Sequence, residues 1–584
     1  MMANDGGAGK RFCVLLLLVF FTLSFSESCK HRVKEGSKKE FESTDYIDVD
    51  VFGDTLQSLL KPADSIAATK IGDISNNLNL VYHLTNYAPV WMNGKGISKA
   101  ADEFIAEVEG ISADGISPER YHFLALKNEL RKLRNNKSPE LKKLIAFDTA
   151  MTRIYLTVAK ELLLGTVKIK KADSLWFASN DSSWAAPITL ATELGLTDKY
   201  PTLDAYRSKV PTYSLLREEY KRYTALHRDS SLLAALAVLR EVRNTRELDS
   251  MQEVSLKIAI TSILPWAKTS VADSADERTQ LVKAYQEYAH VKPTGKLDTS
   301  TLKKLIRQPY QISDILRANM ERIRWIRQEM PPTYIIVNVP LAELFFHRDG
   351  AEVMHMNTVV GKPSRQTPAL NAEMANVVIN PAWGVPPTIL KKDVGPGIGK
   401  SGAAYLRKKG LQAFDRKGNR VDATAIDMSN YKRYQYRQPP GHDNALGYVK
   451  FNLPNKWDIY LHDTPHREDF PQRYRAKSSG CIRVEKPKEM AIYILSEIED
   501  KKFTMGKLDT MIRTHRTNWQ VLKNKIPVHV VYLTAFESRD NTHIRLADDV
   551  YKRDSKLIEC STAYSTCTIR NFRYWVVGIC QTIG

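Results

Sequence analysis

The residues most suited to chemistry are a cysteine and a histidine in the last third of the chain, in the stretches 460–465 (YLHDTP) and 475–484 (RAKSSGCIRV). A thiol becomes a nucleophile when a base or a positive neighbour converts it to a thiolate. His462 stands 19 residues before Cys481, so two neighbouring strands joined by a loop can bring imidazole and sulfur within hydrogen-bonding reach. The pair alone is a weak indication, because a buried cysteine near a hydrogen-bonded histidine is the more common situation.

The residues around Cys481 extend this chemistry. Gly480 has no side chain, so the backbone can approach a substrate closely, and the N–H groups beside Cys481 can stabilise a developing oxyanion. Arg483 follows two residues after Cys481, on the same face of a strand. Its guanidinium can hold a carboxylate bidentately or order the neighbouring loop. The stretch therefore predicts a nucleophilic thiol beside an oxyanion site.

A mainly β domain, from about residue 332 to 510, is predicted to position these residues. Runs of β-branched and aromatic residues between turns predict short strands at 334–339, 341–347, 352–361, 376–380, 457–462 and 481–484. Pro487 at a first-turn position opens one helix, 488–498. Residues 390–450 are rich in Gly, Lys and Tyr and weakly periodic, and are interpreted as a lid inserted over the β core. Residues 511–557 are expected to add C-terminal strands.

The first half of the chain is predicted to be a helical scaffold, spanning about 51–270. Apolar residues recur at three-to-four spacing from Leu141 to Leu164, and Gly165 follows as a C-cap. No catalytic chemistry is concentrated there, which favours a structural role. A basic connecting helix within 310–331 leads from this half to the β domain.

Residues 271–309 are predicted to form a small unit of their own. A helix, a turn at Pro293-Thr294-Gly295 and a second helix capped by Asp298 or Thr299 follow one another. This pattern resembles the three-helix peptidoglycan-binding module. A purely structural helix–turn–helix unit is the alternative, because units of this size are common.

Length and composition limit the function classes. The 584 residues suffice for two to four domains, and 43% hydrophobic with 26% charged residues exclude a mostly disordered chain. A formal net charge of +19 suits nucleic acid, anionic lipid or a cell-wall polymer, and a generally basic surface would explain it as well. The six cysteines contain no CxxC pair and no zinc-ligand spacing, so Cys481 is either inert core filler or a nucleophile.

Residues 1–28 are interpreted as an export signal. Two basic residues precede the apolar run 12–25, which is shorter than the ~20 residues that span a bilayer. The small residue before Cys29 resembles a loose lipoprotein cleavage site, which would place a lipid on Cys29. A plainly cleaved signal and an uncleaved anchor stay open. Residues 29–50 are expected to be a polar tether, and the tail 558–584 has no pattern that predicts a structure.

The strings H-D-T-P and S-S-G-C-I-R-V resemble the signature of the L,D-transpeptidase (YkuD-type) catalytic domain, most closely its large, YcbB-like periplasmic branch. Many members carry a second histidine where Ser479 stands, which leaves His462 as the one histidine of the motif suited to be the base. Further matching stretches are 360–363 (VGKP), 367–368 (TP), 380–388 (NPAWGVPPT) and 444–447 (NALG). The resemblance covers about 51–557.

The resemblance implies a multidomain α+β protein with a helical N-terminal scaffold, a small three-helix peptidoglycan-binding-like module and a mainly β catalytic domain with a lid insertion. It makes Cys481 the nucleophile and His462 the general base. Oxyanion and substrate-binding roles fall to further residues of these stretches, namely Ser479, Gly480, Arg483, Tyr460, Trp383 and Asn444. It implies neither a metal nor an organic cofactor.

The function implied is peptidoglycan L,D-transpeptidation, in which a thioester on Cys481 passes from a tetrapeptide donor to the amine of a second stem and gives a 3→3 cross-link. Carbapenem-type β-lactams are the expected inhibitors, and the expected location is the periplasm or cell envelope, with membrane attachment only through a lipid on Cys29. Nucleic acid is not an expected partner. The alternatives are an L,D-carboxypeptidase or protein-to-wall linking at the same site, and a non-catalytic wall-binding protein.

Overall fold

The computed structural model describes residues 46–60, 73–178, 180, 184–194, 199–267, 275–326 and 330–562. The predicted signal, the tether up to residue 45, and the tail beyond residue 562 lie outside the described residues. Within the described ranges, no helix combines the length and the apolar character needed to cross a membrane.

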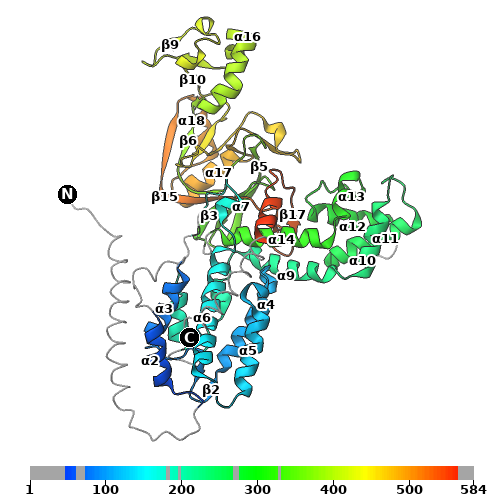
Figure 1. The fold of residues 1–584 in the computed structure, drawn as a ribbon. Helices are drawn as coiled ribbons and strands as arrows, with labels where there is room; N and C mark the ends of the chain where they lie inside the picture. The colour runs from blue at the N-terminus through cyan, green and yellow to red at the C-terminus, as the bar shows by residue number, and fades with distance from the viewer. Residues whose placement is uncertain are drawn as a thin grey trace, which may run out of the picture.

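A bundle of helices forms the N-terminal part, at the bottom of Figure 1: α2 (Val49–Leu59), α3 (Ile74–Leu84), α4 (Lys99–Gly110), α5 (Phe123–Asn135) and α6 (Leu141–Leu164). The predicted bounds of α6 are confirmed. The helix α6 ends at Gly165, where a glycine is required for two reasons. The backbone there has a positive φ of +88°, and a Cβ would lie 2.6 Å from Trp325 Nε1. The glycine therefore lets the next domain's helix pack directly on the end of α6.

Helices α10 (Ser230–Arg240), α11 (Ser250–Ile263), α12 (Ala275–Tyr288) and α13 (Thr299–Leu305) stand together at one side of the molecule (Figure 1). Asp298 caps α13, since its Oδ1 accepts a hydrogen bond from Thr301 N at 2.7 Å. The predicted boundary at residue 270 falls among 268–274, outside the described residues. The described helices before that boundary, α10 and α11, thus belong to the same group as α12 and α13.

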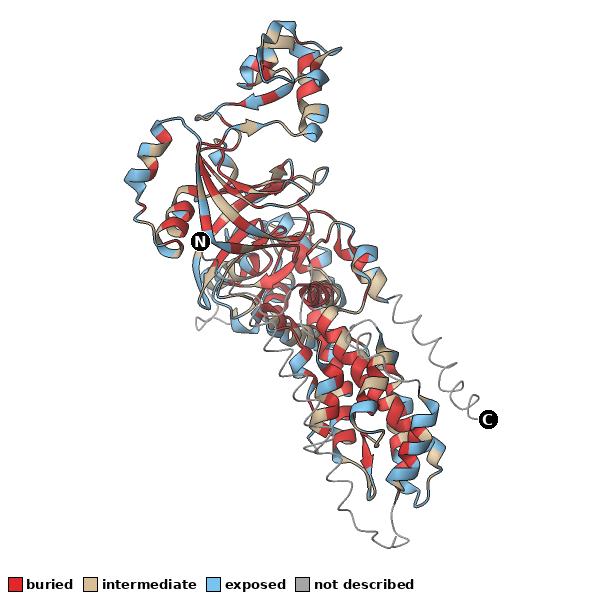
Figure 2. Ribbon diagram, turned by 90° about the vertical axis from the view of Figure 1, so that its left-hand side faces the viewer, coloured by how far each residue is buried: buried red, intermediate tan, exposed pale blue. Residues whose placement is uncertain are grey.

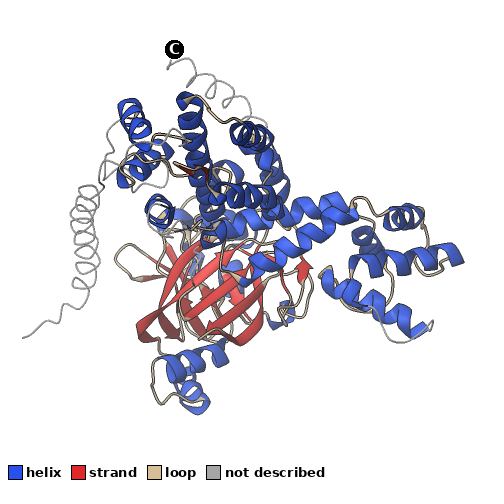
Figure 3. Ribbon diagram, turned by 90° about the horizontal axis from the view of Figure 1, so that it is seen from below, coloured by secondary structure: helices blue, strands red, loops and turns tan. Residues whose placement is uncertain are grey.

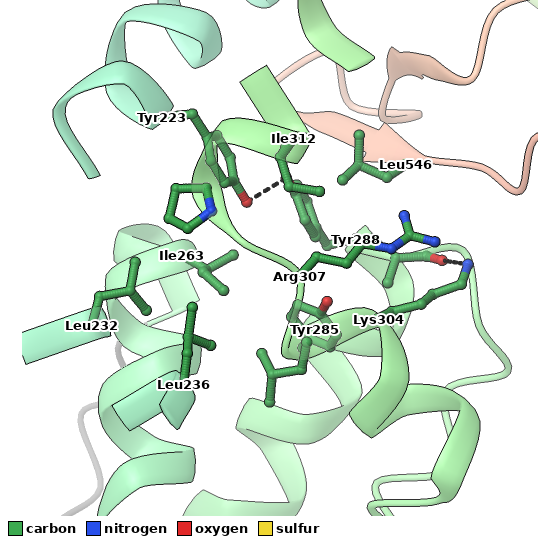
Figure 4. Close-up of a pocket in the computed structure, with 13 residues that line it drawn as sticks. Tyr223, Leu232, Leu236, Ile263, Tyr285, Tyr288, Lys304, Arg307, Ile312 and Leu546 are labelled. Carbon is green, nitrogen blue, oxygen red and sulfur yellow. Dashed lines mark hydrogen bonds between the residues drawn. The ribbon is translucent and has the colours of Figure 1, made fainter. Parts of the chain in front are cut away.

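The interior of this helical group is closely packed (Figure 4). The hydroxyls of Tyr223 and Tyr288 lie 2.8 Å apart, and Lys304 Nζ donates to Ala289 O at 2.6 Å. The cavity between them measures about 10 Å³, which is room for roughly one water molecule. It is too small to hold a ligand.

The catalytic half is built on one nine-stranded sheet in the order β13-β5-β14-β12-β11-β6-β15-β3-β4. The strands are β3 (Thr333–Asn338), β4 (Glu343–Arg348), β5 (Ala351–Gly361), β6 (Leu370–Ile379), β11 (Val449–Asn452), β12 (Leu461–His462), β13 (Ala476–Ser478), β14 (Ile482–Val484) and β15 (Asn518–Val531). The first half of β5 pairs with β4 and its second half with β14 and β13, which closes the sheet into a barrel. Figure 3 shows these strands as one block with helices around it.

The long strand β15 lies between β6 and β3 in the barrel. Residues 511–557 were expected as added strands beside a domain ending near 510, and the structure instead makes 518–531 part of the catalytic sheet. The prediction was wrong because the strand is interrupted by a register shift between Val521 and Ile526, and the residues before this shift are mostly exposed. An apolar run therefore begins only in its second half.

Residues 383–438 form a subdomain that stands above the barrel, at the top of Figure 1. Four short strands, β7 (Trp383–Gly384), β8 (Gln412–Phe414), β9 (Arg420–Val421) and β10 (Gln435–Gln438), make a separate sheet beside α16 (Gly395–Lys408). Its core is a cluster of its own, including Leu406, Tyr431 and Tyr436. The insertion predicted at 390–450 is thus a folded unit with the bounds 383–438, and its core combines aliphatic side chains with Tyr431 and Tyr436, spaced too irregularly to give a period.

Helix α14 (Pro309–Arg324) joins the helical half to the barrel and is buried along most of its length (Figure 2). The connecting helix predicted within 310–331 is confirmed, and it begins one residue earlier, at Pro309, which was assigned to the preceding unit. Two buried arginines on it are paired: Arg322 Nη1 contacts Asp554 Oδ1 at 2.5 Å, and Arg324 Nη1 contacts Glu321 Oε2 at 3.0 Å. Breaking such a buried pair leaves an uncompensated charge. The junction between the halves is consequently a fixed one.

Candidate active site

The register of β12 and β14 places the predicted nucleophile and base on one face of the sheet. In this parallel pair Leu461 lies opposite Ile482, and His462 lies opposite Arg483. Cys481 comes two residues before Arg483, and side chains alternate along a strand. Cys481, His462 and Arg483 therefore face the same side, while Leu461 and Ile482 are buried on the other.

The imidazole of His462 is held as a neutral base. Its Nδ1 donates to the backbone oxygen of Asp463 at 2.5 Å, which leaves Nε2 with a lone pair. Burial lowers the pKa of His462 to about 3, and the positive charges of Arg483 and Lys450 add to the effect. The imidazole is therefore neutral at neutral pH, with Nε2 unprotonated.

The thiol of Cys481 is partly exposed, so a substrate can reach it. Sγ lies 3.5 Å from the backbone oxygen of Asp458, and the hydroxyl of Tyr460 is hydrogen-bonded to it. Burial raises the pKa of the thiol, whereas the Tyr460 hydrogen bonds and the Lys450 charge lower it. In the described structure the resting sulfur is therefore a protonated thiol, whose hydrogen bonds do not include His462.

Three hydrogen bonds fix the backbone before the nucleophile. Ser478 Oγ donates to Cys481 O at 2.5 Å and accepts from Gly480 N at 3.1 Å, and Thr367 Oγ1 donates to Gly480 O at 2.7 Å. They hold Gly480 at φ +124°, in the region that favours glycine. Within the described chain, the N–H of Cys481 has no hydrogen-bond partner and is free to donate to an oxyanion.

Arg483 orders a loop, which is the second of the two roles predicted for it. Its Nη1 contacts Asp469 Oδ2 at 3.0 Å, and Lys477 Nζ contacts the other oxygen of the same carboxylate at 2.7 Å. Burial lowers the pKa of Arg483. The guanidinium is therefore already engaged with a carboxylate of this chain.

The insertion reaches the active site at two points. Trp383 is hydrogen-bonded to Tyr460, so both predicted aromatic groove residues lie together near the thiol. Arg365 forms a two-pronged ion pair with Asp393 of the insertion and donates to Ser479 Oγ at 2.8 Å. Ser479 thus links the catalytic loop to the insertion.

Asn444 differs from the other predicted site residues. It is buried, and its Nδ2 donates to the backbone oxygens of Pro381 and Pro439 at 3.0 and 2.8 Å, while Oδ1 accepts from Leu446 N at 2.8 Å. Its amide is thus committed to holding the base of the insertion rather than to a groove.

Sequence reasoning missed several residues that shape the site, namely Lys450, Arg365, Asp469 and the Thr367 hydroxyl. Lys450 lies opposite His462 on β11, a pairing that no local pattern reveals. Thr367 belongs to the stretch 367–368 that resembles the family, so the sequence indicated its position but not its role. The described residues contain no group of three or more His, Cys, Asp or Glu side chains that could hold a metal ion.

Comparison with protein families agrees with this geometry. Residues 332–521 match YkuD, the L,D-transpeptidase catalytic domain, and residues 76–219 match the Scaffold domain. The resemblance predicted from the sequence is confirmed: the chain carries a YkuD-type L,D-transpeptidase catalytic domain behind a helical scaffold.

The individual proteins similar to this chain include a curated relative and several solved structures. A Haemophilus influenzae protein named "Putative L,D-transpeptidase" is 33% identical over 292 residues, which is 49% of this chain and 57% of that protein. The chain thus spans a little over half of this relative. Among solved structures, an L,D-transpeptidase from Stackebrandtia nassauensis is 14% identical, covers 52% of this chain and 100% of its own, and has a TM-score of 0.19. A mutant Enterococcus faecium L,D-transpeptidase is 11% identical, with 51% and 98% covered and a TM-score of 0.17.

Proposed function

We propose that the chain is a peptidoglycan L,D-transpeptidase that forms 3→3 cross-links through a thioester on Cys481. The observation that carries the proposal is the shared face of Cys481 and His462 in a YkuD-type domain, with Nδ1 of the imidazole bound to Asp463 O and Nε2 free to take a proton. The acyl group would come from a tetrapeptide stem.

In the first half-reaction, the thiol proton passes to His462 Nε2 as Sγ attacks the carbonyl carbon of the third stem residue. The carbonyl oxygen becomes an oxyanion that the Cys481 N–H can stabilise. The C–N bond to the terminal D-amino acid then breaks, and His462 returns the proton to the departing amine. The product is a thioester between the shortened stem and the sulfur.

In the second half-reaction, a side-chain amine of another stem attacks the thioester carbonyl. His462 accepts a proton from that amine, the C–S bond breaks, and the proton returns to the sulfur. The subdomain 383–438 supports the choice of amine over water, because it contacts the site through Trp383 and Asp393 and can exclude solvent there. The net charge of +19 and the predicted export signal fit a site of action in the cell envelope.

The test is to incubate the purified chain with tetrapeptide stems and to weigh the intact protein and its products. We expect a tripeptide adduct on Cys481, dimeric product, and the same adduct site for a carbapenem. Cys481→Ala should give no adduct and His462→Gln should slow acylation about 10²–10⁴-fold. No adduct, or one that maps elsewhere, would refute the proposal. Tripeptide without any dimer would replace it by an L,D-carboxypeptidase.

A further inference from the structure

Lys450 is a half-buried cation on the catalytic face that the reaction scheme does not use. It lies on β11 directly opposite His462, and its Nζ is 4.1 Å from the centre of the Tyr460 ring. In the part of the chain that the structure describes, Lys450 has no carboxylate within ion-pair distance. Burial without a partner disfavours the charged lysine, and its pKa is accordingly lowered.

The other cations near the thiol are already paired. Arg483 on β14 holds Asp469, and Arg365 holds Asp393 of the insertion. The other groups that act on the ionisation of Cys481 are Tyr460, which directly precedes β12, and the carboxylate of Asp458 in the preceding loop, which opposes it, while His462 on β12 is neutral. Of these three cations, Lys450 is thus the one that forms no ion pair with a carboxylate among the described residues.

We propose that Lys450 is a positioning residue for the nucleophile, which stabilises Cys481 as an anion both through space and through the Tyr460 hydroxyl, while His462 carries the proton. A cation over the face of a phenol ring withdraws electron density from it and makes the hydroxyl a stronger donor to the sulfur. The same charge disfavours an imidazolium. The inference rests on the proposed function only in taking Cys481 as the nucleophile.

This arrangement differs from a resting thiolate–imidazolium pair. Two positive groups beside His462, Arg483 and Lys450, oppose a third charge there, and Lys450 also favours a negative sulfur. The anion would therefore form transiently, under Lys450, as the proton leaves through the neutral imidazole. Substituting the lysine should shift the ionisation of the thiol and leave the fold of the barrel unchanged.

The test measures alkylation of Cys481 by iodoacetamide from about pH 6 to about pH 10, read by peptide mass, because alkylation needs no peptide substrate. In Lys450→Met the profile should move to higher pH and the rate at neutral pH should fall about 3- to 10-fold, where one pKa unit is tenfold. Lys450→Arg should restore most of the rate. The control Lys525→Met removes an exposed lysine paired with Glu373 and should match the wild type.

A profile of Lys450→Met that superimposes on the wild type would overturn the inference. A second measurement needs no variant: the wild-type ratio of iodoacetate to iodoacetamide rates should exceed that of a free cysteine, because the cation attracts the anionic reagent. A ratio at or below that of free cysteine would also overturn it. Failure of the tetrapeptide adduct with both alkylation results intact would refute the proposed function and leave the role of Lys450 standing.

Discussion

Replacing Thr367 by valine should separate the oxyanion site from the thiol. Thr367 is fully buried, and its Oγ1 donates to Gly480 O at 2.7 Å and accepts from Gly361 N at 2.9 Å. Valine keeps the shape of the side chain and removes both bonds. Two buried backbone groups then lose their partner, one of them in the residue that precedes the nucleophile.

The size of the effect follows from these two groups. An unsatisfied buried backbone group costs about 1–3 kcal/mol, and partial relaxation places the loss of unfolding free energy at about 2–4 kcal/mol. Gly480 at φ +124° is then free to relax, which moves the N–H of Cys481. Since loss of one oxyanion donor costs about 10²–10³ in rate, acylation by a tetrapeptide or a carbapenem should fall about 100-fold.

The assay compares Thr367→Val with Thr367→Ser. Serine keeps both hydrogen bonds and loses one methyl group, at a cost of about 1 kcal/mol. Acylation is followed by intact mass at a temperature where near-UV circular dichroism shows both variants folded, and iodoacetamide alkylation reports the thiol itself. We expect the valine variant to lose acylation and keep alkylation. Equal acylation rates in the two variants would contradict the role assigned to the hydroxyl.

Three further predictions follow from the geometry. Because the pKa of His462 is about 3, the rate of Cys481 alkylation should climb from about pH 5 to about pH 9 without an inflection near the ordinary pKa of histidine. For the same reason the unfolded chain binds a proton on His462 at higher pH than the folded chain does, so the free energy of unfolding should fall as the pH drops from 6.5 toward 3. Urea titration measures this fall, which should be smaller in His462→Gln. Arg365→Asp should loosen the insertion in limited proteolysis, and adding Asp393→Arg should restore about 1 kcal/mol of protection, whereas additive losses would contradict the pair. Gly447→Ala should destabilise the fold more than Gly350→Ala, although both glycines have positive φ, +58° and +83°. A Cβ at Gly447 would overlap the buried carboxyl group of Asp463, whereas a Cβ at Gly350 would meet open space. Equal shifts in melting temperature would count against the packing argument.

Local sequence patterns predicted the structural features that depend on residues close together in the chain. The bounds of α6, the Asp298 cap and most barrel strands follow from periodicity and turn residues. The long strand β15 was placed outside the domain, because the apolar residues of its first half, such as Trp519 and Val521, are exposed and its partners are more than a hundred residues away. The insertion gave no clear period because its core residues, among them Leu406, Tyr431 and Tyr436, are scattered irregularly between Val394 and Tyr436.

The active-site residues likewise fall into those that the sequence predicted and those that it did not. The motif identified Cys481 and His462, and strand alternation gave the shared face of Arg483. Lys450 stayed invisible, because a lysine between Val449 and Phe451 reads as the outward side of an ordinary strand. Only the pairing of β11 with β12 shows that this side is the catalytic face. Residues whose role depends on non-local register cannot be derived from one sequence.

The opposing influences on the sulfur account for the kind of nucleophile that this site provides. Burial keeps the thiol protonated at rest, and the unbalanced charge of Lys450 lowers the free energy of the anion when it forms. Were the lysine paired, as the two arginines are, burial alone would leave the sulfur too weakly acidic for attack at neutral pH. Were burial absent, a standing thiolate would react with any electrophile that reached it. A substrate bound beside Cys481 would displace water and strengthen the lysine's charge at the sulfur. If the proposed function holds, a bound stem peptide would itself raise the reactivity of Cys481, and selectivity for stem peptides over small electrophiles would follow from the same contacts that bind them.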